Sequence, residues 1–281
     1  MAGKPRTLRK SPITGSPDHR ITRSLSRPPS LIAYITCGDP TVAATREIIL
    51  AAMRAGADVI ELGVPFSDPV ADGPVIQRAS ERALKHGTSL QDVLEVAREV
   101  RRESDAGLVI FSYLNPILRF GIERFCHEAV QDGVDGVLIT DLTVEEAEDY
   151  RRVMEHHGLA PIFLAAPTSP DHRLKKIAQA CQGFVYAVSR TGVTGTQKEL
   201  AGDARDLVRR IRRFTKLPVA VGFGISNAGQ FAQVADFADA AVVGSAIVQA
   251  VEQNPGREAQ AVADLVRSLQ SGSKHSASSR N

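Results

Sequence analysis

The chain has 281 residues, of which 43% are hydrophobic and 23% charged, and its formal net charge is +2. No run of 18 or more apolar residues occurs, and the first ten residues hold no apolar segment, so we expect neither a membrane span nor a secretory signal. The three cysteines are few and widely separated, which favours a reducing cytoplasm over a disulfide framework. No Cys or His pair has metal-ligand spacing, so no metal site is expected.

The basic residues are concentrated at the two ends of the chain. Residues 1–30 hold seven Lys or Arg against one Asp, and residues 271–281 add two more basic residues. The middle of the chain is therefore acidic, and it has no basic, aromatic-spaced face, which argues against nucleic acid as a partner. The N-terminal stretch is also rich in Pro and Ser, which predicts disordered tails over 1–30 and 271–281. An organellar transit peptide is the alternative for the N-terminal tail.

Short apolar runs of strand length follow one another from residue 31 onward. They lack polar alternation, which is typical of parallel strands that are buried on both faces. The runs cover residues 31–36, 58–63, 108–114, 136–141, 161–166, 184–189, 218–223 and 240–245.

Helical patterns separate these runs, with apolar residues three or four positions apart and Gly or His near the end. Clear examples are 41–56, 143–158 and 170–183, and the pattern over 74–86 is followed by an additional one over 88–100. Eight strand–helix units in about 240 residues predict an α/β fold, a single (β/α)₈ TIM barrel with extra helices. A doubly wound sheet is the alternative, but it usually has fewer strands and less even spacing.

The barrel domain is predicted over residues 31–270. The segment before it, 19–30, shows no clear amphipathic helix, and Pro28 and Pro29 would interrupt one. In such barrels the active site lies at the carboxyl ends of the strands and in the loops that follow them.

Glu61 ends the second apolar run, and the loop after it carries Asp68 and Asp72. A carboxylate at the end of a buried strand costs free energy unless it is paired, hydrogen-bonded or functional. A salt bridge to a neighbouring strand is one explanation for Glu61. A second acid on a loop that faces the ligand favours the other explanation, a pair of carboxyl groups with different acid–base roles.

Glycines collect in the loops after the last three runs, as "TGVTG" (191–195), "GFGIS" (222–226) and "VGSAIV" (243–248). Glycine lets backbone N–H groups approach an anion, and a helix that begins at residue 245 would direct its N-terminus to the same point. The loops after the seventh and eighth strands are the usual phosphate position in these barrels, so a phosphate site is predicted here.

The blocks "LIAYITCGDP", "ELGVPFSDPVADGPVIQRA", "YLNPI", "VYAVSRTGVTG", "GFGIS" and "VVGSAIV" together resemble the tryptophan synthase alpha subunit family, in the same order. The second block is the most specific. The resemblance implies a cytoplasmic (β/α)₈ lyase of L-tryptophan biosynthesis that cleaves indole-3-glycerol phosphate to indole and glyceraldehyde 3-phosphate. It also implies no cofactor in this chain and an α₂β₂ heterotetramer with a beta subunit that carries pyridoxal phosphate.

The resemblance assigns roles to individual residues. Glu61 matches the catalytic glutamate, which gives and takes the proton, and Asp72 the catalytic aspartate, which stabilises positive charge at the indole N–H. The residues that match the substrate-binding positions, or lie at the strand ends expected around the indole, are Tyr34, Phe111, Tyr113, Leu138, Thr140, Tyr186, Gly195, Gly222, Phe223, Gly224, Gly244 and Ser245.

The resemblance also implies that Asp68, with Asn115 and Thr194, lies at the beta-subunit interface or in a switch, although Asp68 before Pro69 is also typical of a turn. Cys37 has no accompanying histidine motif and is interpreted as a small buried residue. Two other functions stay open: a stand-alone indole-releasing lyase, and an inactive partner that only activates a beta subunit. The presence of both Glu61 and Asp72 disfavours the inactive partner.

Overall fold

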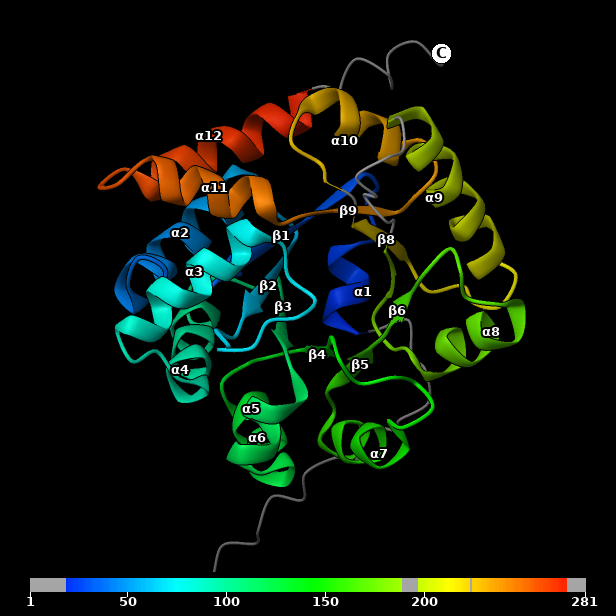
Figure 1. The fold of residues 1–281 in the computed structure, drawn as a ribbon, viewed down its shortest axis with the longest axis horizontal. Helices are drawn as coiled ribbons and strands as arrows, with labels where there is room; N and C mark the ends of the chain where they lie inside the picture. Colours follow the sequence, from blue (N-terminus) through cyan, green and yellow to red (C-terminus); the bar gives the residue numbers. More distant parts are fainter. Residues whose placement is uncertain (1–18, 189–196, 223, 272–281) are drawn as a thin grey trace, which may run out of the picture.

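The structure is a computed structural model that describes residues 19–188, 197–222 and 224–271. Over these ranges, parallel strands form a ring at the centre of the molecule and helices surround it (Figure 1). The predicted TIM-barrel class is confirmed. None of the described helices has the length and apolar character needed to cross a membrane.

Every strand pair in the described sheet is parallel, in the order β5-β4-β3-β2-β1-β9-β8-β7-β6. The strands are β1 (Ser30–Thr36), β2 (Val59–Gly63), β3 (Gly107–Ser112), β4 (Gly136–Ile139), β5 (Ala160–Ile162), β6 (Leu164–Ala165), β7 (Val185–Val188), β8 (Val219–Gly222) and β9 (Ala240–Val243).

The run predicted over 161–166 is divided into β5 and β6 at Phe163. β5 pairs with β4 and β6 pairs with β7, so this interrupted strand closes the ring. The Phe163 amide donates to Cys181 Sγ at 3.3 Å, while the Phe163 carbonyl accepts from the Tyr186 amide at 3.3 Å. The interruption therefore follows from a backbone amide that bonds to a side chain outside the sheet.

The larger described helices are α2 (Val42–Ala55), α3 (Pro74–Lys85), α4 (Leu90–Arg101), α5 (Leu114–Phe120), α6 (Ile122–Gln131), α7 (Glu148–His157), α8 (Asp171–Ala180), α9 (Gln197–Ile211), α10 (Ala228–Ala235), α11 (Ser245–Gln253) and α12 (Glu258–Ser271). Extra helices follow β2, β3 and β9, so more than one unit carries two helices. The helix predicted over 143–158 begins only at Glu148, because Thr143 and Glu146 first form a hydrogen-bonded turn.

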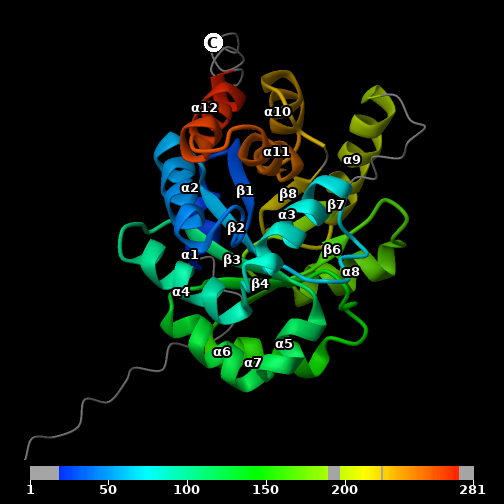
Figure 2. The same ribbon diagram turned by 60° about the vertical axis from the view of Figure 1, so that its left-hand side comes forward.

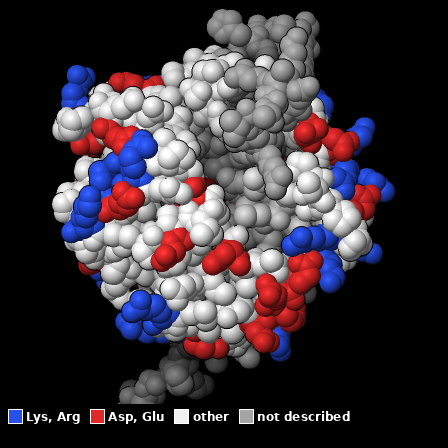
Figure 3. All heavy atoms as spheres, viewed as in Figure 1, with Lys and Arg blue, Asp and Glu red and all other residues white. Residues whose placement is uncertain are grey.

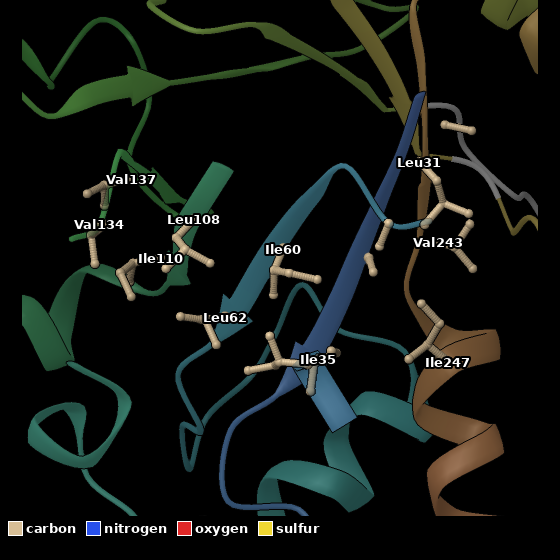
Figure 4. Packing of buried hydrophobic residues seen from close by; sticks show 14 of the residues in the cluster. Leu31, Ile35, Ile60, Leu62, Leu108, Ile110, Val134, Val137, Val243 and Ile247 are labelled. Carbon is tan, nitrogen blue, oxygen red and sulfur yellow. The ribbon is translucent and has the colours of Figure 1, made fainter. Parts of the chain in front are cut away.

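Alternation along the strands sorts their side chains into two layers. Figure 4 shows Ile35 on β1, with Ile60 and Leu62 on β2, packed in the layer between the strands and the helices. Their neighbours Ile32 and Val59 point into the barrel. Each such side chain contributes about 1.5–3 kcal/mol by leaving water. The same alternation directs Glu61, two residues after Val59, to the inside.

The prediction of a disordered tail over residues 1–30 is wrong for residues 19–30. A short helix, α1 (Arg20–Ser24), lies at the centre of the ring in Figure 1. Its Ile21 is fully buried, and Leu25 just after it is 1% exposed. Thr22 Oγ1 donates to the Gly183 carbonyl at 3.1 Å. Residues 1–18 and 272–281, the rest of the two predicted tails, lie outside the described residues.

Ile21 packs against the first residues of neighbouring strands, at the amino end of the barrel. A Cβ built on Gly136 would lie 2.9 Å from Ile21 Cδ1, and one on Gly107 would lie 3.4 Å from Ile21 Cα. Arg20 Nη1 donates to Asp135 Oδ1 at 2.7 Å, just before β4. The helix therefore closes the amino end of the barrel.

Replacing Ile21 with Ala is expected to lower the free energy of unfolding by about 2–5 kcal/mol, because it leaves a cavity among residues that converge on the barrel axis. Urea unfolding followed by circular dichroism measures the change. Leu118→Ala, at a position 49% exposed on α5, is the matched control, and we expect it to change stability by less than about 0.5 kcal/mol. Equal effects of the two substitutions would contradict the assignment of α1 to the core.

Candidate active site

A cavity of about 300 Å³ opens at the carboxyl ends of the strands. A larger groove of about 480 Å³ lies outside the barrel between α2 and α12, where no strand ends, so volume alone does not identify the site. The described residues that line the cavity at the strand ends are Tyr34, Glu61, Ile76, Phe111, Tyr186, Gly222, Gly224, Ile225, Ser226, Val242, Gly244, Ser245, Ala246 and Gln249.

Glu61 is fully buried on β2, in register with Tyr34 of β1 and Val109 of β3. Neither of its carboxyl oxygens has a hydrogen-bond partner in the described part of the chain, so the salt bridge considered from the sequence is not formed there. Burial raises the pKa of Glu61 to about 8. At neutral pH the carboxyl group is therefore mostly protonated, and it can give a proton to a ligand in the cavity.

Tyr34 and Tyr186 flank Glu61 from β1 and β7. Burial raises the pKa of both phenols, with a further contribution mainly from Asp72 at Tyr34 and from Glu61 at Tyr186, so each hydroxyl stays protonated. Both rings fit because a glycine lies beside each hydroxyl. A Cβ on Gly63 would lie 2.3 Å from Tyr34 Oη, and one on Gly222 would lie 2.4 Å from Tyr186 Oη. These glycines thus admit an aromatic ring that any larger residue would displace.

Asp72 lies on the loop between β2 and α3, beside the cavity lining. Tyr113 Oη donates to Asp72 Oδ2 at 3.1 Å and accepts from the Ala71 amide at 2.9 Å. Gln77 Nε2, in the first turn of α3, donates to the Asp72 carbonyl at 2.9 Å. Burial raises the pKa of Asp72 to about 6, and the Tyr113 hydrogen bond partly opposes this shift. The loop is thus held over the strand ends by Tyr113, which follows β3, and by Gln77 of α3.

The remaining aromatic and apolar residues predicted at the site are divided between the cavity and its surroundings. Phe111 lines the cavity, and its ring meets Tyr34 edge to face with centroids 5.1 Å apart. Thr140 lies outside the lining and donates from Oγ1 to the Ser112 carbonyl at 3.3 Å. Leu138 is fully buried in the inner layer of the barrel. Tyr113 does not line the cavity and contacts the site by its hydrogen bond to Asp72.

The predicted phosphate end consists of glycine turns and a helix start. Gly224 has a φ of +40°, a conformation that favours glycine, and Gly244 immediately precedes α11, which begins at Ser245. No Lys or Arg occurs among the described lining residues, so backbone N–H groups and the α11 N-terminus are the groups suited to an anion. On the face shown in Figure 3, Lys and Arg side chains lie toward the edge of the view. Gly195, Phe223 and Thr194 lie outside the described residues.

Two lining residues on helices, Ile76 and Gln249, are not among the residues predicted at the site. Ile76 belongs to the first turn of α3, and Gln249 lies one turn after Ser245 on α11. Both could have been found by continuing each helical pattern from the predicted loop onto the same helix face.

Three other residues are placed outside the cavity. Cys37 is fully buried, and burial raises the pKa of its thiol to about 12, so it is not a poised nucleophile. Asp68 is exposed, and it accepts from Ser67 Oγ at 2.5 Å and, through its carbonyl, from the Val70 amide at 2.9 Å. Asn115 is exposed near the start of α5. The described residues hold no cluster of His, Cys, Asp and Glu suited to a metal ion.

The closed parallel barrel, with an acid-bearing cavity at the carboxyl ends of its strands, defines an enzyme of the (β/α)₈ class. Comparison with known proteins narrows this class. The model of one protein family, described as Tryptophan synthase alpha chain, matches residues 24–278. The chain belongs to the tryptophan synthase alpha chain family.

Individual relatives agree with this assignment. The tryptophan synthase alpha chain of Solibacter usitatus is 53% identical over 225 residues, which cover 80% of this chain and 84% of that protein. The alpha chain of Geotalea daltonii is 46% identical and covers 86% and 92%. Among solved structures, tryptophan synthase subunit alpha from Legionella pneumophila superposes with a TM-score of 0.84 at 36% identity, covering 92% of this chain and 99% of that one.

The family assignment fixes the reaction and its context. The chain is a carbon–carbon lyase of tryptophan biosynthesis that cleaves indole-3-glycerol phosphate, and it uses no cofactor of its own.

A chain of tryptophan synthase from M. tuberculosis, in an aminoacrylate-bound form, is also similar, with a TM-score of 0.80 at 35% identity over 89% of this chain and 94% of that one.

Replacing Glu61 with Gln is expected to stabilise the ligand-free chain at alkaline pH. Below pH 4.5 the folded and unfolded states both hold the proton; up to about pH 8 only the folded state keeps it, so the free energy of unfolding falls as the pH rises. The glutamine side chain of the variant carries no charge, so its free energy of unfolding does not fall in this way. Above pH 8 we expect the variant to be more stable than the native chain by on the order of a few kcal/mol. Thermal unfolding from pH 4 to 9 measures it.

Glu81→Gln, at an exposed position on α3, is the matched control for the loss of one acidic group. A Glu61→Gln variant whose stability depends on pH as steeply as the native chain would show that Glu61 is not buried in its neutral form.

Proposed function

We propose that Glu61 and Asp72 together carry out the retro-aldol cleavage of indole-3-glycerol phosphate in the cavity at the strand ends. The observation that supports this most directly is Glu61, a fully buried carboxyl group without a hydrogen-bond partner among the described residues. Such a group costs free energy in the free chain, and a substrate that uses its proton offsets that cost.

Glu61 performs both proton transfers. Its carboxyl group first protonates indole C3, so that the ring can accept an electron pair. The resulting carboxylate then takes the proton of the glycerol hydroxyl next to the ring as the C–C bond breaks. The electron pair of that bond restores the indole ring, the hydroxyl carbon becomes the aldehyde of glyceraldehyde 3-phosphate, and Glu61 is protonated again. A pKa near 8 suits a group that alternates between acid and base.

Asp72 acts on the other side of the indole. Protonation at C3 places positive charge on the ring nitrogen, and a carboxylate that accepts the N–H hydrogen bond stabilises this charge. Asp72 is ionised above pH about 6, and its hydrogen bond to Tyr113 keeps it at the edge of the cavity. Its place on a loop lets it move toward the ring after substrate has entered.

The cavity has separate ends for the two halves of the substrate. Tyr34, Phe111 and Ile76 form an apolar wall suited to the indole ring. Gly224, Gly244 and Ser245 provide the backbone groups and helix start suited to the phosphate. Tyr186 lies beside Glu61, with its hydroxyl available as a donor. We expect Gly195 and Phe223 to complete the phosphate end.

The pH dependence of kcat/KM for indole release is expected to be bell-shaped. Activity falls above pH about 8, because Glu61 loses the proton that it must give, and below pH about 6, because Asp72 becomes neutral. Asp72→Asn removes the acid limb and lowers kcat, and Glu61→Gln lowers kcat by about 10²–10⁴-fold. Coupled detection of glyceraldehyde 3-phosphate measures both. Full activity in Glu61→Gln would overturn the proposed roles.

We further propose that the chain works with a tryptophan synthase beta subunit in an α₂β₂ heterotetramer. Support comes from the loop after β2 and the face of α3, where Val70 is 86% exposed and Leu84 is 37% exposed. These side chains border a surface groove of about 310 Å³ that also includes Phe66 and Asp68. Exposed apolar side chains beside a groove are typical of a protein–protein contact. Asp68, Asn115 and Thr194 are proposed for this interface or its switch.

Leu84→Asp is expected to weaken association with a beta subunit by roughly 30-fold, because it places a charge where an apolar contact is lost. Analytical ultracentrifugation of the mixed subunits measures the affinity. Val130→Asp, at a position 40% exposed on α6, is the control and is expected to leave the affinity unchanged. Equal effects of both variants would exclude this surface as the interface.

Indole release with and without the beta subunit separates the complexed enzyme from a stand-alone lyase or an inactive partner.

We propose residues 19–271 as one catalytic unit located in the cytoplasm. The extent is supported by the burial of Ile21 near one end and of Leu269 on α12 near the other. The location is supported by Cys37, Cys126 and Cys181, which are all buried as free thiols.

A further inference from the structure

Helices α3 and α11 each begin at one end of the substrate cavity. α3 has Gly73 as its N-cap, immediately after Asp72, and α11 begins at Ser245 in the predicted phosphate end. Figures 1 and 2 both show the two helices side by side. A small apolar cluster that contains Ala79 of α3 and Val248 of α11 packs between them and against β1. The relative position of these helices therefore sets the distance between Asp72 and the phosphate end.

Charged groups join the same two helices further along their length. Arg82 of α3 donates from Nε and Nη2 to the two carboxylate oxygens of Asp39, each at 2.8 Å. Its Nη1 donates to Glu252 Oε1 of α11 at 2.7 Å. Arg78 of α3 also binds Glu252 through two hydrogen bonds, of 2.9 and 2.8 Å. We call Asp39, Arg78, Arg82 and Glu252 the arginine clamp.

The arginine clamp has a fixed geometry. Asp39 is only 3% exposed, and both of its oxygens are held by one planar guanidinium group. The hydrogen bonds from Arg78 and Arg82 lower the pKa of Glu252 to about 2, so this carboxylate stays charged throughout the working pH range. Arg82 thereby fixes α3 to the turn after β1 and to α11 at once.

Ion pairs within one helix lack this reach. Arg98–Glu95 and Arg124–Glu128 each join neighbouring turns of a single helix. Such pairs contribute little to stability or geometry. The arginine clamp instead joins three separate elements. Gln77, which precedes Arg78 on α3, donates to the Asp72 carbonyl and extends the connection to the loop.

We propose that Arg82 is a positioning residue that couples phosphate binding to the placement of Asp72, a role that rests on the proposed function of the cavity. An anion at the start of α11 fixes that helix. The Glu252–Arg82 contact passes the constraint to α3, and Gly73 and Gln77 pass it to Asp72. The phosphate half of the substrate thus helps to bring the carboxylate to the indole half.

Two probes that each fill one half of the cavity test this coupling. Calorimetry measures the affinity of the native chain for indole with and without saturating glycerol 3-phosphate. Glycerol 3-phosphate is expected to tighten indole binding about fivefold or more, the usual lower range for coupled sites. In Arg82→Gln the gain falls to within about twofold, while the affinity for glycerol 3-phosphate alone stays close to that of the native chain.

The same variant is expected to change kcat and KM differently. Without Arg82 the Asp72 carboxylate is no longer held in its catalytic position, and this weakens stabilisation of the transition state. We therefore expect kcat for indole-3-glycerol phosphate to fall about 10-fold to 100-fold, with little change in KM. Arg98→Gln is the matched control, since it removes an arginine from an ion pair within one helix, and it should change neither the coupling nor kcat. If Arg82→Gln does not fold, Glu252→Gln is used in its place, because it retains the size of the side chain and a hydrogen-bond acceptor. It is expected to show the same loss of coupling and of kcat.

The outcomes separate this inference from the function on which it rests. A native chain without coupling, or an Arg82→Gln or Glu252→Gln variant with native coupling and kcat, would overturn the role of the arginine clamp. An equal loss in Arg98→Gln would overturn it as well, because the effect would then be nonspecific. Indole release by the native chain that is lost in Glu61→Gln supports the proposed function whatever the clamp variants do.

Discussion

Burial of the Glu61 carboxyl group without a hydrogen-bond partner in the described chain is the constraint on which the site depends. The alternation of β2 directs this side chain inward, and the closed ring keeps it from water, so the proton is held up to pH about 8. A well-solvated glutamate at the same strand end would be ionised at neutral pH and unable to protonate a carbon atom. The barrel therefore sets the chemistry of the residue as well as its position.

The strand pattern could be predicted because parallel strands buried on both faces require continuous apolar runs, as in 31–36 and 58–63. The positions of Glu61 and Asp72 followed from the same logic, since loops after these strands must meet at one end of the ring. Helix α1 escaped prediction because only Ile21 and Leu25 in this segment are apolar, and their burial depends on a barrel interior formed by distant strands.

Other features depend on side chains far apart in the sequence. The break at Phe163 requires Cys181, 18 residues away, and Arg82 finds its partners 43 and 170 residues away. No local pattern encodes such contacts. Leu138 is predicted at the cavity, and it does point into the barrel like its register partner Phe111, but it is packed in the inner layer and does not line the cavity. The sequence thus locates the strand ends more readily than the depth at which the packed layer gives way to the cavity.

The α1 plug at the amino end gives the barrel a closed floor below Glu61. The cavity meets the surroundings at the carboxyl end, where substrate enters, so a bound substrate stands between the carboxyl group and bulk water. The proton that Glu61 delivers to C3 and the one that it recovers from the hydroxyl are then exchanged within one enclosed space. Glu61 therefore ends each catalytic cycle protonated, without taking a proton from bulk water. Helix α1 contributes to this by closing the amino end of the barrel.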